Sequence, residues 1–102
     1  MSAARKRPAV STVVPIFNEE ANLPALFQRL ASTLDKTGVD YEMIFVDDGS
    51  SDRSLELLDE FARENKRVVV VEFVRNFGQH AAVFAGFERA RGQVVVTLDA
   101  DL

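Results

Sequence analysis

The 102-residue sequence contains no cysteine, and its acidic residues outnumber its basic ones, giving a net charge of −4. Without cysteine there are no disulfides and no thiolate metal sites, which fits a reducing, cytoplasmic compartment. The net negative charge gives no attraction for a polyanion, so we expect no nucleic-acid partner. No apolar run is long enough to cross a membrane or to act as a signal peptide, so we expect no transmembrane segment in this chain.

The composition is that of a globular protein with a packed core. Apolar residues make up 47% and charged residues 27% of the chain, too apolar a balance for a disordered protein. A chain of this length forms one small domain at most. We expect residues 1–8, which include three consecutive basic residues, to be a flexible tail and residues 9–102 to form the domain.

Short apolar runs alternate with segments of helical spacing. Runs rich in Val and Ile predict buried parallel strands at residues 10–16, 41–46, 68–74 and 94–98. Apolar residues at helical spacing predict one helix after Asn22 and a second after Ser51 or Asp52, with those residues as N-caps. Strands and helices in this order build an α/β fold, an open parallel sheet of about four strands with helices on both faces.

A third helix is predicted from about residue 79 to residue 91. Its apolar positions place Val83, Gly86, Phe87 and Ala90 on the inward face. Gly92 follows directly and is expected to be its C-terminal cap.

Carboxylates follow three of the four predicted strands. In an open parallel sheet, ligands bind beyond the carboxyl ends of the strands. Asp47 and Asp48 follow the second strand, and Asp99 and Asp101 follow the fourth, where alternation puts both on the same side. Their hard oxygen atoms suit Mg²⁺ or Mn²⁺ held together with substrate phosphates. The alternatives are a solvated loop for the second pair, and a turn with a helix cap for residues 47–52.

The first strand is followed by Glu19 and Glu20 and by no glycine-rich turn. The missing turn argues against a nucleotide-binding oxidoreductase. The two glutamates suit a helix dipole, but they would repel a pyrophosphate, so bound phosphates would need a cation. A receiver-type signalling domain also gathers acids at strand ends, but it needs an aspartate after the third strand, where this chain has Arg75 and Asn76.

Three segments in register carry a resemblance to a known family. Residues 13–20 (VVPIFNEE), 45–50 (FVDDGS) and 99–102 (DADL) resemble the successive signatures of family 2 glycosyltransferases with the GT-A fold. Residues 75–82 (RNFGQHAA) resemble the polyprenyl-phosphate branch of that family, which includes dolichyl-phosphate mannose synthase and undecaprenyl-phosphate aminoarabinose transferase. The chain thus resembles the Rossmann-like, nucleotide-binding half of a GT-A domain that stops after the Asp-x-Asp motif.

The resemblance implies a role for each matching residue. Pro15, Phe17 and Glu19 would line the nucleotide pocket, and Asp47, or Asp48 beside it, would contact the base. The family usually has tyrosine at the position of Phe17, so stacking would remain without the hydroxyl contact.

For the fourth strand, the resemblance implies that Asp99 lies near the sugar and the metal and that Asp101 ligates the metal, so both would be catalytic. The single His80 is open to a catalytic role or to a structural one as a hydrogen-bonding residue at a helix start.

The implied reaction transfers a sugar from a nucleoside diphosphate, with UDP favoured, to a polyprenyl phosphate at the inner face of a membrane. The alternative is a truncated, non-catalytic fragment that binds a nucleotide sugar, because the acceptor site and the remaining metal ligands would lie beyond Leu102. We therefore expect these residues alone to bind the donor without transferring the sugar.

Overall fold

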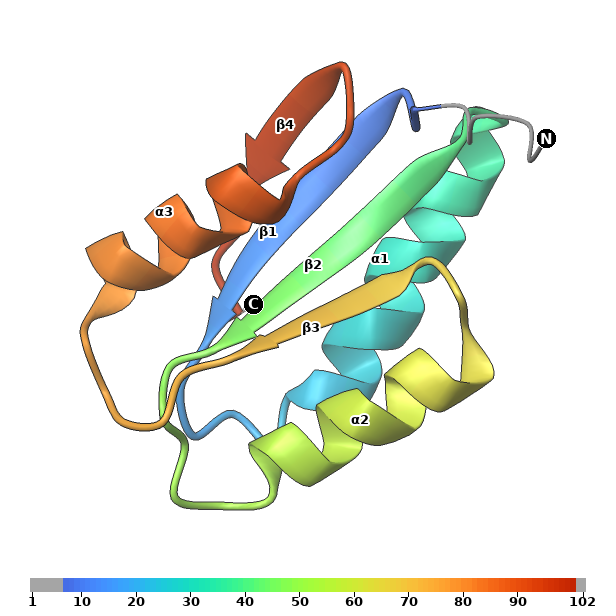
Figure 1. Cartoon of the computed structure of the whole chain (residues 1–102). Helices are drawn as coiled ribbons and strands as arrows, with labels where there is room; N and C mark the ends of the chain where they lie inside the picture. Colours follow the sequence, from blue (N-terminus) through green and yellow to red (C-terminus); the bar gives the residue numbers. More distant parts are fainter. Residues whose placement is uncertain (1–6, 101–102) are drawn as a thin grey trace, which may run out of the picture.

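The computed structural model describes residues 7–100, and the sequence-predicted residue Asp101 lies outside this range. The elements follow one another in strict alternation: β1 (Val10–Ile16), α1 (Leu23–Thr37), β2 (Tyr41–Asp47), α2 (Ser54–Glu64), β3 (Val68–Glu72), α3 (Gln79–Arg89) and β4 (Val94–Thr97). The four strands are all parallel and form one sheet in the order β3-β2-β1-β4 (Figure 1). The predicted open parallel sheet is confirmed.

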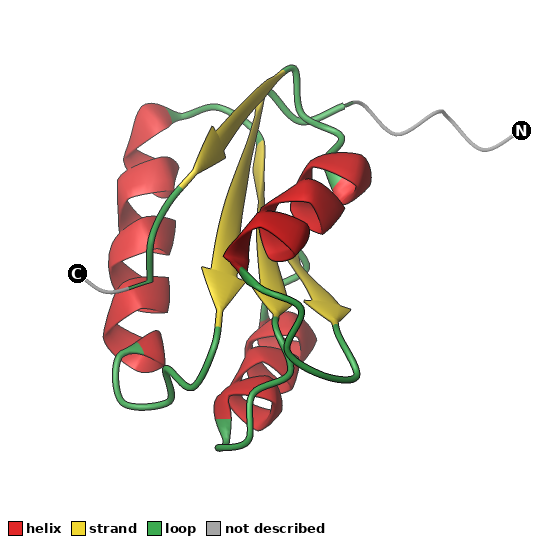
Figure 2. Cartoon of the chain, turned by 90° about the vertical axis from the view of Figure 1, so that its left-hand side faces the viewer, coloured by secondary structure: helices red, strands yellow, loops and turns green. Residues whose placement is uncertain are grey.

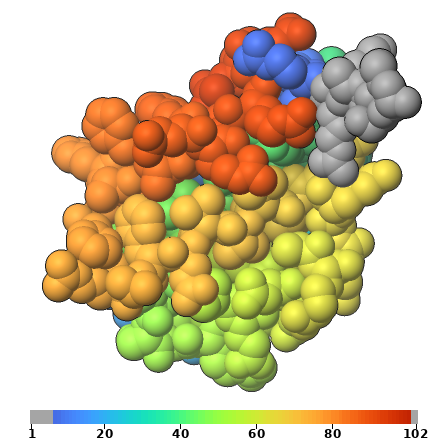
Figure 3. Space-filling view, viewed as in Figure 1, coloured from blue at the N-terminus to red at the C-terminus, as the bar shows by residue number. Residues whose placement is uncertain are grey.

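Helices cover both faces of the sheet, also as predicted. Figure 2 shows the sheet nearly edge-on, with α1 and α2 on one side and α3 on the other. Side chains alternate along each strand, so Val14 and Ile16 of β1 pack against α1, whereas Val13 packs against Ala82 of α3. On the side of α3, helices and outer strands leave β1 and β2 almost hidden (Figure 3).

The larger core lies between the sheet and the helix pair α1 and α2. Leucines at helical spacing on α1 are buried against Phe45 of β2. Phe27 of α1 stacks on Phe61 of α2 with ring centroids 4.2 Å apart. This packing fixes the helices that follow β1 and β2, and thereby the loops at the carboxyl ends of those strands.

The packing of α3 on β1 is close and depends on small residues. Ala82 and Gly86 are buried, and a Cβ atom on Gly86 would lie 2.2 Å from Cγ1 of Val13. The predicted inward face was partly wrong, because Phe87 is 46% exposed and Ala82 is buried instead. With Gly86 against β1, the helix sits too near the sheet for a phenylalanine ring to fit beside it.

Two predicted helix caps were wrong. The second helix begins at Ser54 rather than directly after Ser51 or Asp52, although Oδ1 of Asp52 accepts a bond of 2.9 Å from the Ser54 amide. The third helix ends at Arg89, and Gly92 does not adopt the left-handed conformation of a helix cap. Gly92 instead allows the segment before β4 to approach β1 closely, since a Cβ atom there would lie 2.5 Å from Oγ of Ser11.

β4 is not covered on both faces, although the sequence predicted that all four strands would be. It is an outer strand of the sheet, and Val94, Val95 and Val96 are 57%, 38% and 40% exposed. Within the described residues, no strand pairs with its outer edge. At the start of the chain, Pro8 is buried and Nε of Arg7 donates a bond of 2.9 Å to the carbonyl of Arg91.

Candidate functional site

A pocket of about 200 Å³ lies where the carboxyl ends of β1, β2 and β4 meet the start of α3. Five of its lining residues were expected from the sequence, namely Pro15, Phe17, Glu19, Asp48 and Asp99. Three others, Ile16, Gln79 and Ala100, were not expected. Residues far apart in the sequence are therefore brought to one place, because parallel strands present their carboxyl ends at the same edge.

A larger pocket, of about 400 Å³, lies at the opposite edge of the sheet and includes none of the predicted site residues. Its cations include Arg89, the last residue of α3, and Arg67, which pairs with Asp40. Basic residues near helix C-termini are explained by the helix dipole, so we place the candidate site at the carboxyl edge.

The loops after β1 and β2 are held together by hydrogen bonds between them. Asn18, at a positive φ of 53°, has its amide bonded to Oγ of Ser50 at 2.9 Å, and its Oδ1 accepts from the Ser51 amide at 2.8 Å. The Glu19 amide donates to Oγ of Ser54 at 2.8 Å. These serines therefore have a structural role, in fixing the loop that presents Phe17 and Glu19 to the pocket.

Phe17 and Glu19 meet the pocket in different ways. The Phe17 ring is 46% exposed, which leaves a flat apolar surface free at the pocket wall. The Glu19 carboxylate accepts a bond of 2.9 Å from Nδ2 of Asn22, just before α1 begins. Glu19 thus serves the start of the helix and lines the pocket at the same time.

Asp47, the last residue of β2, is buried and does not line the pocket, whereas the next residue, Asp48, does. Asp47 is 2% exposed, and its Oδ1 is the one buried side-chain oxygen or nitrogen without a hydrogen-bond partner among residues 7–100. Burial raises the pKa of the Asp47 carboxyl above its usual value, and hydrogen bonds from Ser50 offset this only in part. A buried carboxylate with a free acceptor is costly to leave without a donor.

The Asp48 carboxylate is occupied by the loop between β3 and α3. Oδ1 accepts from the Phe77 amide at 2.7 Å, and Oδ2 accepts from the Gly78 amide at 3.1 Å and from Nδ2 of Asn76 at 3.0 Å. Asp48 therefore lies at the pocket wall with both carboxylate oxygens already bonded within the protein.

Gly49 allows the loop between β3 and α3 to pack directly against the backbone that follows β2. Its φ is 73°, and a Cβ atom there would lie 2.3 Å from the carbonyl carbon of Arg75. Both the left-handed conformation and the tight contact exclude a larger residue. Glycine is thus required at this position for close packing against the loop as well as for the conformation of the turn.

Asp99 follows β4 and is exposed in the pocket, where Nε2 of Gln79 donates a bond of 3.2 Å to its Oδ1. The sequence interpretation missed Gln79, because an exposed polar residue at the first position of a helix leaves no trace in a hydrophobic pattern. His80, next to it, is exposed and its side chain makes no hydrogen bond within the described residues.

The described residues contain no group of three histidine or acidic side chains that would hold a metal alone. The pocket carries the carboxylates of Glu19, Asp48 and Asp99, however, and Mg²⁺ is commonly held by one or two carboxylates together with substrate phosphates. Hard oxygen donors of this kind fit Mg²⁺ or Mn²⁺. None of the helices in residues 7–100 is both long and apolar enough to span a bilayer.

Comparison with known proteins identifies the family. The model of glycosyl transferase family 2 matches residues 11–102. The chain belongs to glycosyl transferase family 2. This membership confirms the resemblance inferred from the sequence and is incompatible with the receiver-type alternative.

Curated relatives of this family 2 chain come from the predicted branch. The undecaprenyl-phosphate 4-deoxy-4-formamido-L-arabinose transferase of Aeromonas hydrophila is 53% identical over 94 residues. The match covers 91% of this chain but only 29% of the relative, so the chain spans less than a third of the length of such transferases.

Solved glycosyltransferase structures share the fold. Residues 1–349 of TarS from S. aureus match with a TM-score of 0.76 and 26% identity, over 90% of this chain and 27% of that one. TarS 1–349 has also been solved with UDP and with UDP-GlcNAc. The mannosyltransferase PcManGT from Pyrobaculum calidifontis, in complex with GDP-Man and Mn²⁺, matches with a TM-score of 0.70 and 26% identity, over 94% and 28% of the two chains. The family 2 chain therefore has the predicted GT-A type of α/β fold.

Proposed function

We propose that this chain binds a nucleoside diphosphate sugar, with UDP favoured, at the carboxyl edge of the sheet, and that it forms the donor-binding part of a transferase acting on a polyprenyl phosphate. The observation that carries the proposal is Asp47, whose buried Oδ1 has no donor among residues 7–100. The imide N–H of uracil is a donor of the kind this oxygen needs. Asp47 lies one residue from the pocket wall at Asp48.

The residues around Asp47 support a nucleotide in this orientation. Phe17 offers a half-exposed ring on which a base would stack, and Pro15 adds apolar surface beside it. TarS 1–349, of similar fold, has been solved with UDP-GlcNAc, which agrees with uridine. Guanine also presents an N–H edge, and PcManGT was solved with GDP-Man, so guanosine nucleotides are the comparison to make.

The diphosphate would lie toward Asp99, where the pocket is acidic. Because Glu19, Asp48 and Asp99 would repel phosphates, the site needs a cation, and Asp99 and Asp101 are the residues that would hold Mg²⁺ or Mn²⁺. When bound, the ion neutralises charge that develops on the departing diphosphate. The contribution of this chain is to orient the donor between Asp47 and Asp99.

The acceptor is inferred from the relatives, which are named as undecaprenyl-phosphate transferases. A phosphate oxygen of such a lipid is already anionic at neutral pH, so a strong general base is unnecessary. A lipid acceptor also implies that the intact protein works at the inner, cytoplasmic face of a membrane. Since the chain spans 29% of the relative, a non-catalytic donor-binding fragment is the second candidate.

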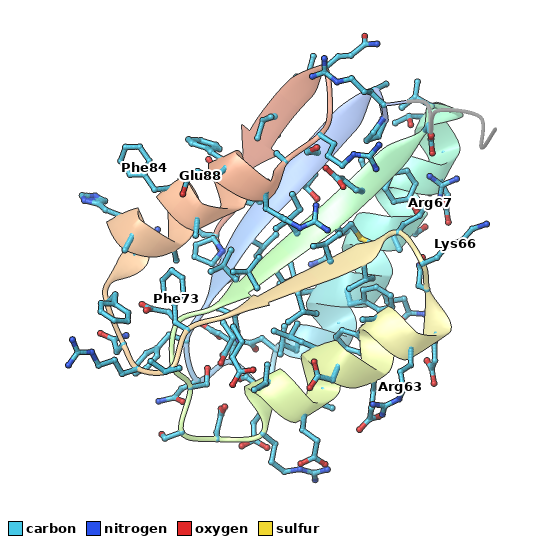
Figure 4. All side chains as sticks on the ribbon, viewed as in Figure 1. Arg63, Lys66, Arg67, Phe73, Phe84 and Glu88 are labelled. Carbon is cyan, nitrogen blue, oxygen red and sulfur yellow. The ribbon has the colours of Figure 1, made fainter. Side chains whose placement is uncertain are left out.

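Calorimetry of the purified chain with UDP-sugars tests the proposal. Affinity should rise about tenfold or more when Mn²⁺ replaces a chelator, and Asp99→Ala and Asp101→Ala should each remove most of that gain, since charge-assisted contacts are worth about 1.5–3 kcal/mol. The matched control is Glu88→Ala, because Glu88 lies on the outer side of α3, away from the pocket (Figure 4). Equal affinity in Mn²⁺ and in chelator, or equal loss in the control, would refute a metal-dependent donor site.

A further inference from the structure

The loop between β3 and α3 is hydrogen-bonded to the rest of the protein through one residue, Asp48. Within residues 74–78, the hydrogen bonds that anchor the loop to another element all run to Asp48, from the Phe77 and Gly78 amides and from the Asn76 side chain. Bonds from N–H groups to a carboxylate are charge-assisted and about twice as strong as neutral ones. Asp48 is 4% exposed, so water competes little for these bonds.

One further contact joins the loop to the segment after β2, and two side-chain contacts hold the loop itself together. Gly49 lies directly against the backbone of Arg75 and Asn76, where any side chain would collide. The Phe77 ring packs edge-on against the Phe73 ring, with ring centroids 5.5 Å apart. The guanidinium carbon of Arg75 lies over the Phe77 ring, 4.8 Å from its centroid. The end of the loop therefore has a defined position relative to Asp48.

That position determines where Gln79 lies. Gln79 is the first residue of α3 and directly follows Gly78, whose amide Asp48 holds at 3.1 Å. Its Nε2 reaches across the pocket to Oδ1 of Asp99, at 3.2 Å. One oxygen of Asp99 is thus bonded to α3, and no hydrogen bond to the other is found within the described residues.

We propose that Asp48 and Gln79 are positioning residues for Asp99: Asp48 fixes the loop that starts α3, and Gln79 then orients the Asp99 carboxylate for the metal-bound diphosphate. The inference rests on the proposed donor site and adds two residues to it. Asp48 acts through the loop and does not contact the base, although it lies next to Asp47.

The test uses the 102-residue chain and three variants. Gln79→Met removes the N–H donor at similar side-chain size, and Gln28→Met makes the same change at an exposed site on α1 as a control. Asp48→Asn replaces one of the two acceptor oxygens of the carboxylate by an NH₂ group, which cannot accept the hydrogen bonds of the loop. Hydrogen exchange is followed at the Phe77 and Gly78 amides, and UDP-sugar affinity is measured in Mn²⁺ and in chelator.

Asp48→Asn should speed exchange at Phe77 and Gly78, whereas Gln79→Met should leave it unchanged. Both should lower UDP-sugar affinity in Mn²⁺ by about three- to tenfold, the usual effect of one lost hydrogen bond. Gln79→Met should leave the affinity of UMP in chelator the same. The double variant should lose no more than the larger single loss, because the two residues act in one chain.

A general structural role for Gln79 predicts a different outcome, in which UMP and UDP-sugar binding fall together. That result, or wild-type affinity of Gln79→Met in Mn²⁺, overturns the inference and leaves the donor site standing. Absence of Mn²⁺ dependence in the wild-type chain overturns the proposed function itself. If Asp48→Asn does not fold, Gln79→Met still decides, since Gln79 is exposed and its loss removes no core contact.

Discussion

Asp47 carries a charge that the folded chain compensates only in part. Its carboxylate is 2% exposed and one oxygen lacks a donor within the described residues. Because burial raises the pKa, the native state binds the Asp47 proton more tightly than the unfolded state does. The free energy of unfolding should therefore fall as the pH rises above 3.8 and through the raised pKa, and the loss persists at neutral pH.

Asp47→Asn should accordingly stabilise the ligand-free chain and weaken donor binding. We expect about 1 kcal/mol more stability at pH 7, because a neutral amide is less costly to bury, and no difference below pH 3.8, where aspartate is also neutral. Uridine nucleotides should bind about 1–2 kcal/mol more weakly, since the charge-assisted bond is lost. Urea denaturation at the two pH values and calorimetry with UDP measure these effects. A variant that is less stable at pH 7 would contradict this account of Asp47.

At the scale of the elements, the site is a set of loops that hold one another. The loop after β1 is bonded to the start of α2, and the segment after β2 is bonded to the loop before α3. None of these loops is positioned by its own sequence alone. Changes at the contacts between loops should therefore alter both stability and the donor pocket.

Gly49→Ala is the sharpest such change, and Gly38→Ala is its matched control. The two glycines have φ values of 73° and 72°, but a Cβ atom would meet the Arg75 backbone at 2.3 Å in the first case and nothing within 4 Å in the second. Gly38→Ala should cost about 1 kcal/mol, from backbone strain alone. Gly49→Ala should cost about 2 kcal/mol more, because the loop must move. Equal urea midpoints for the two variants would show that the loops are not in firm contact.

The elements were predicted from the sequence far better than their junctions. β1 and β2 were found because they are short, mainly apolar runs that the helices bury on both faces, and β1 was found to the residue. Gly92 was misassigned because glycine serves both a helix cap and a close contact, and only the position of Ser11 decides between them. Gln79 was missed because its bond to Asp99 joins two exposed residues of different elements.

At the scale of the whole molecule, this chain corresponds to 29% of the length of a relative that transfers a sugar to undecaprenyl phosphate. The described pocket lies between β1, β2, β4 and α3, and its lining is acidic and polar around Phe17 and Pro15. Its size and lining fit the proposed nucleotide donor better than a long lipid. Donor binding and acceptor binding should therefore be separable.

The 102 residues alone should bind UDP-sugar without forming glycolipid, because transfer requires the acceptor to be held within attack distance of the donor. The assay combines the purified chain, UDP-sugars, Mg²⁺ and a polyprenyl phosphate, with a full-length family 2 transferase as the positive control. Product formed by the short chain above the rate without protein would place an acceptor site within these residues and refute the separation.

From the strand order we also expect an order of events during folding. β1 pairs with β2 on one side and with β4 on the other, so Val10 has Tyr41 and Val94 as its neighbours. Contacts close in sequence form sooner, because closing a long loop costs more entropy. The amides of β1, β2 and β3 should become protected first. β4 should pair with β1 last, and only then does Asp99 reach its place in the pocket. Pulse-labelled hydrogen exchange during refolding tests this order. Donor binding should return only in the kinetic phase that protects the β4 amides, so that only the fully folded chain binds the ligand.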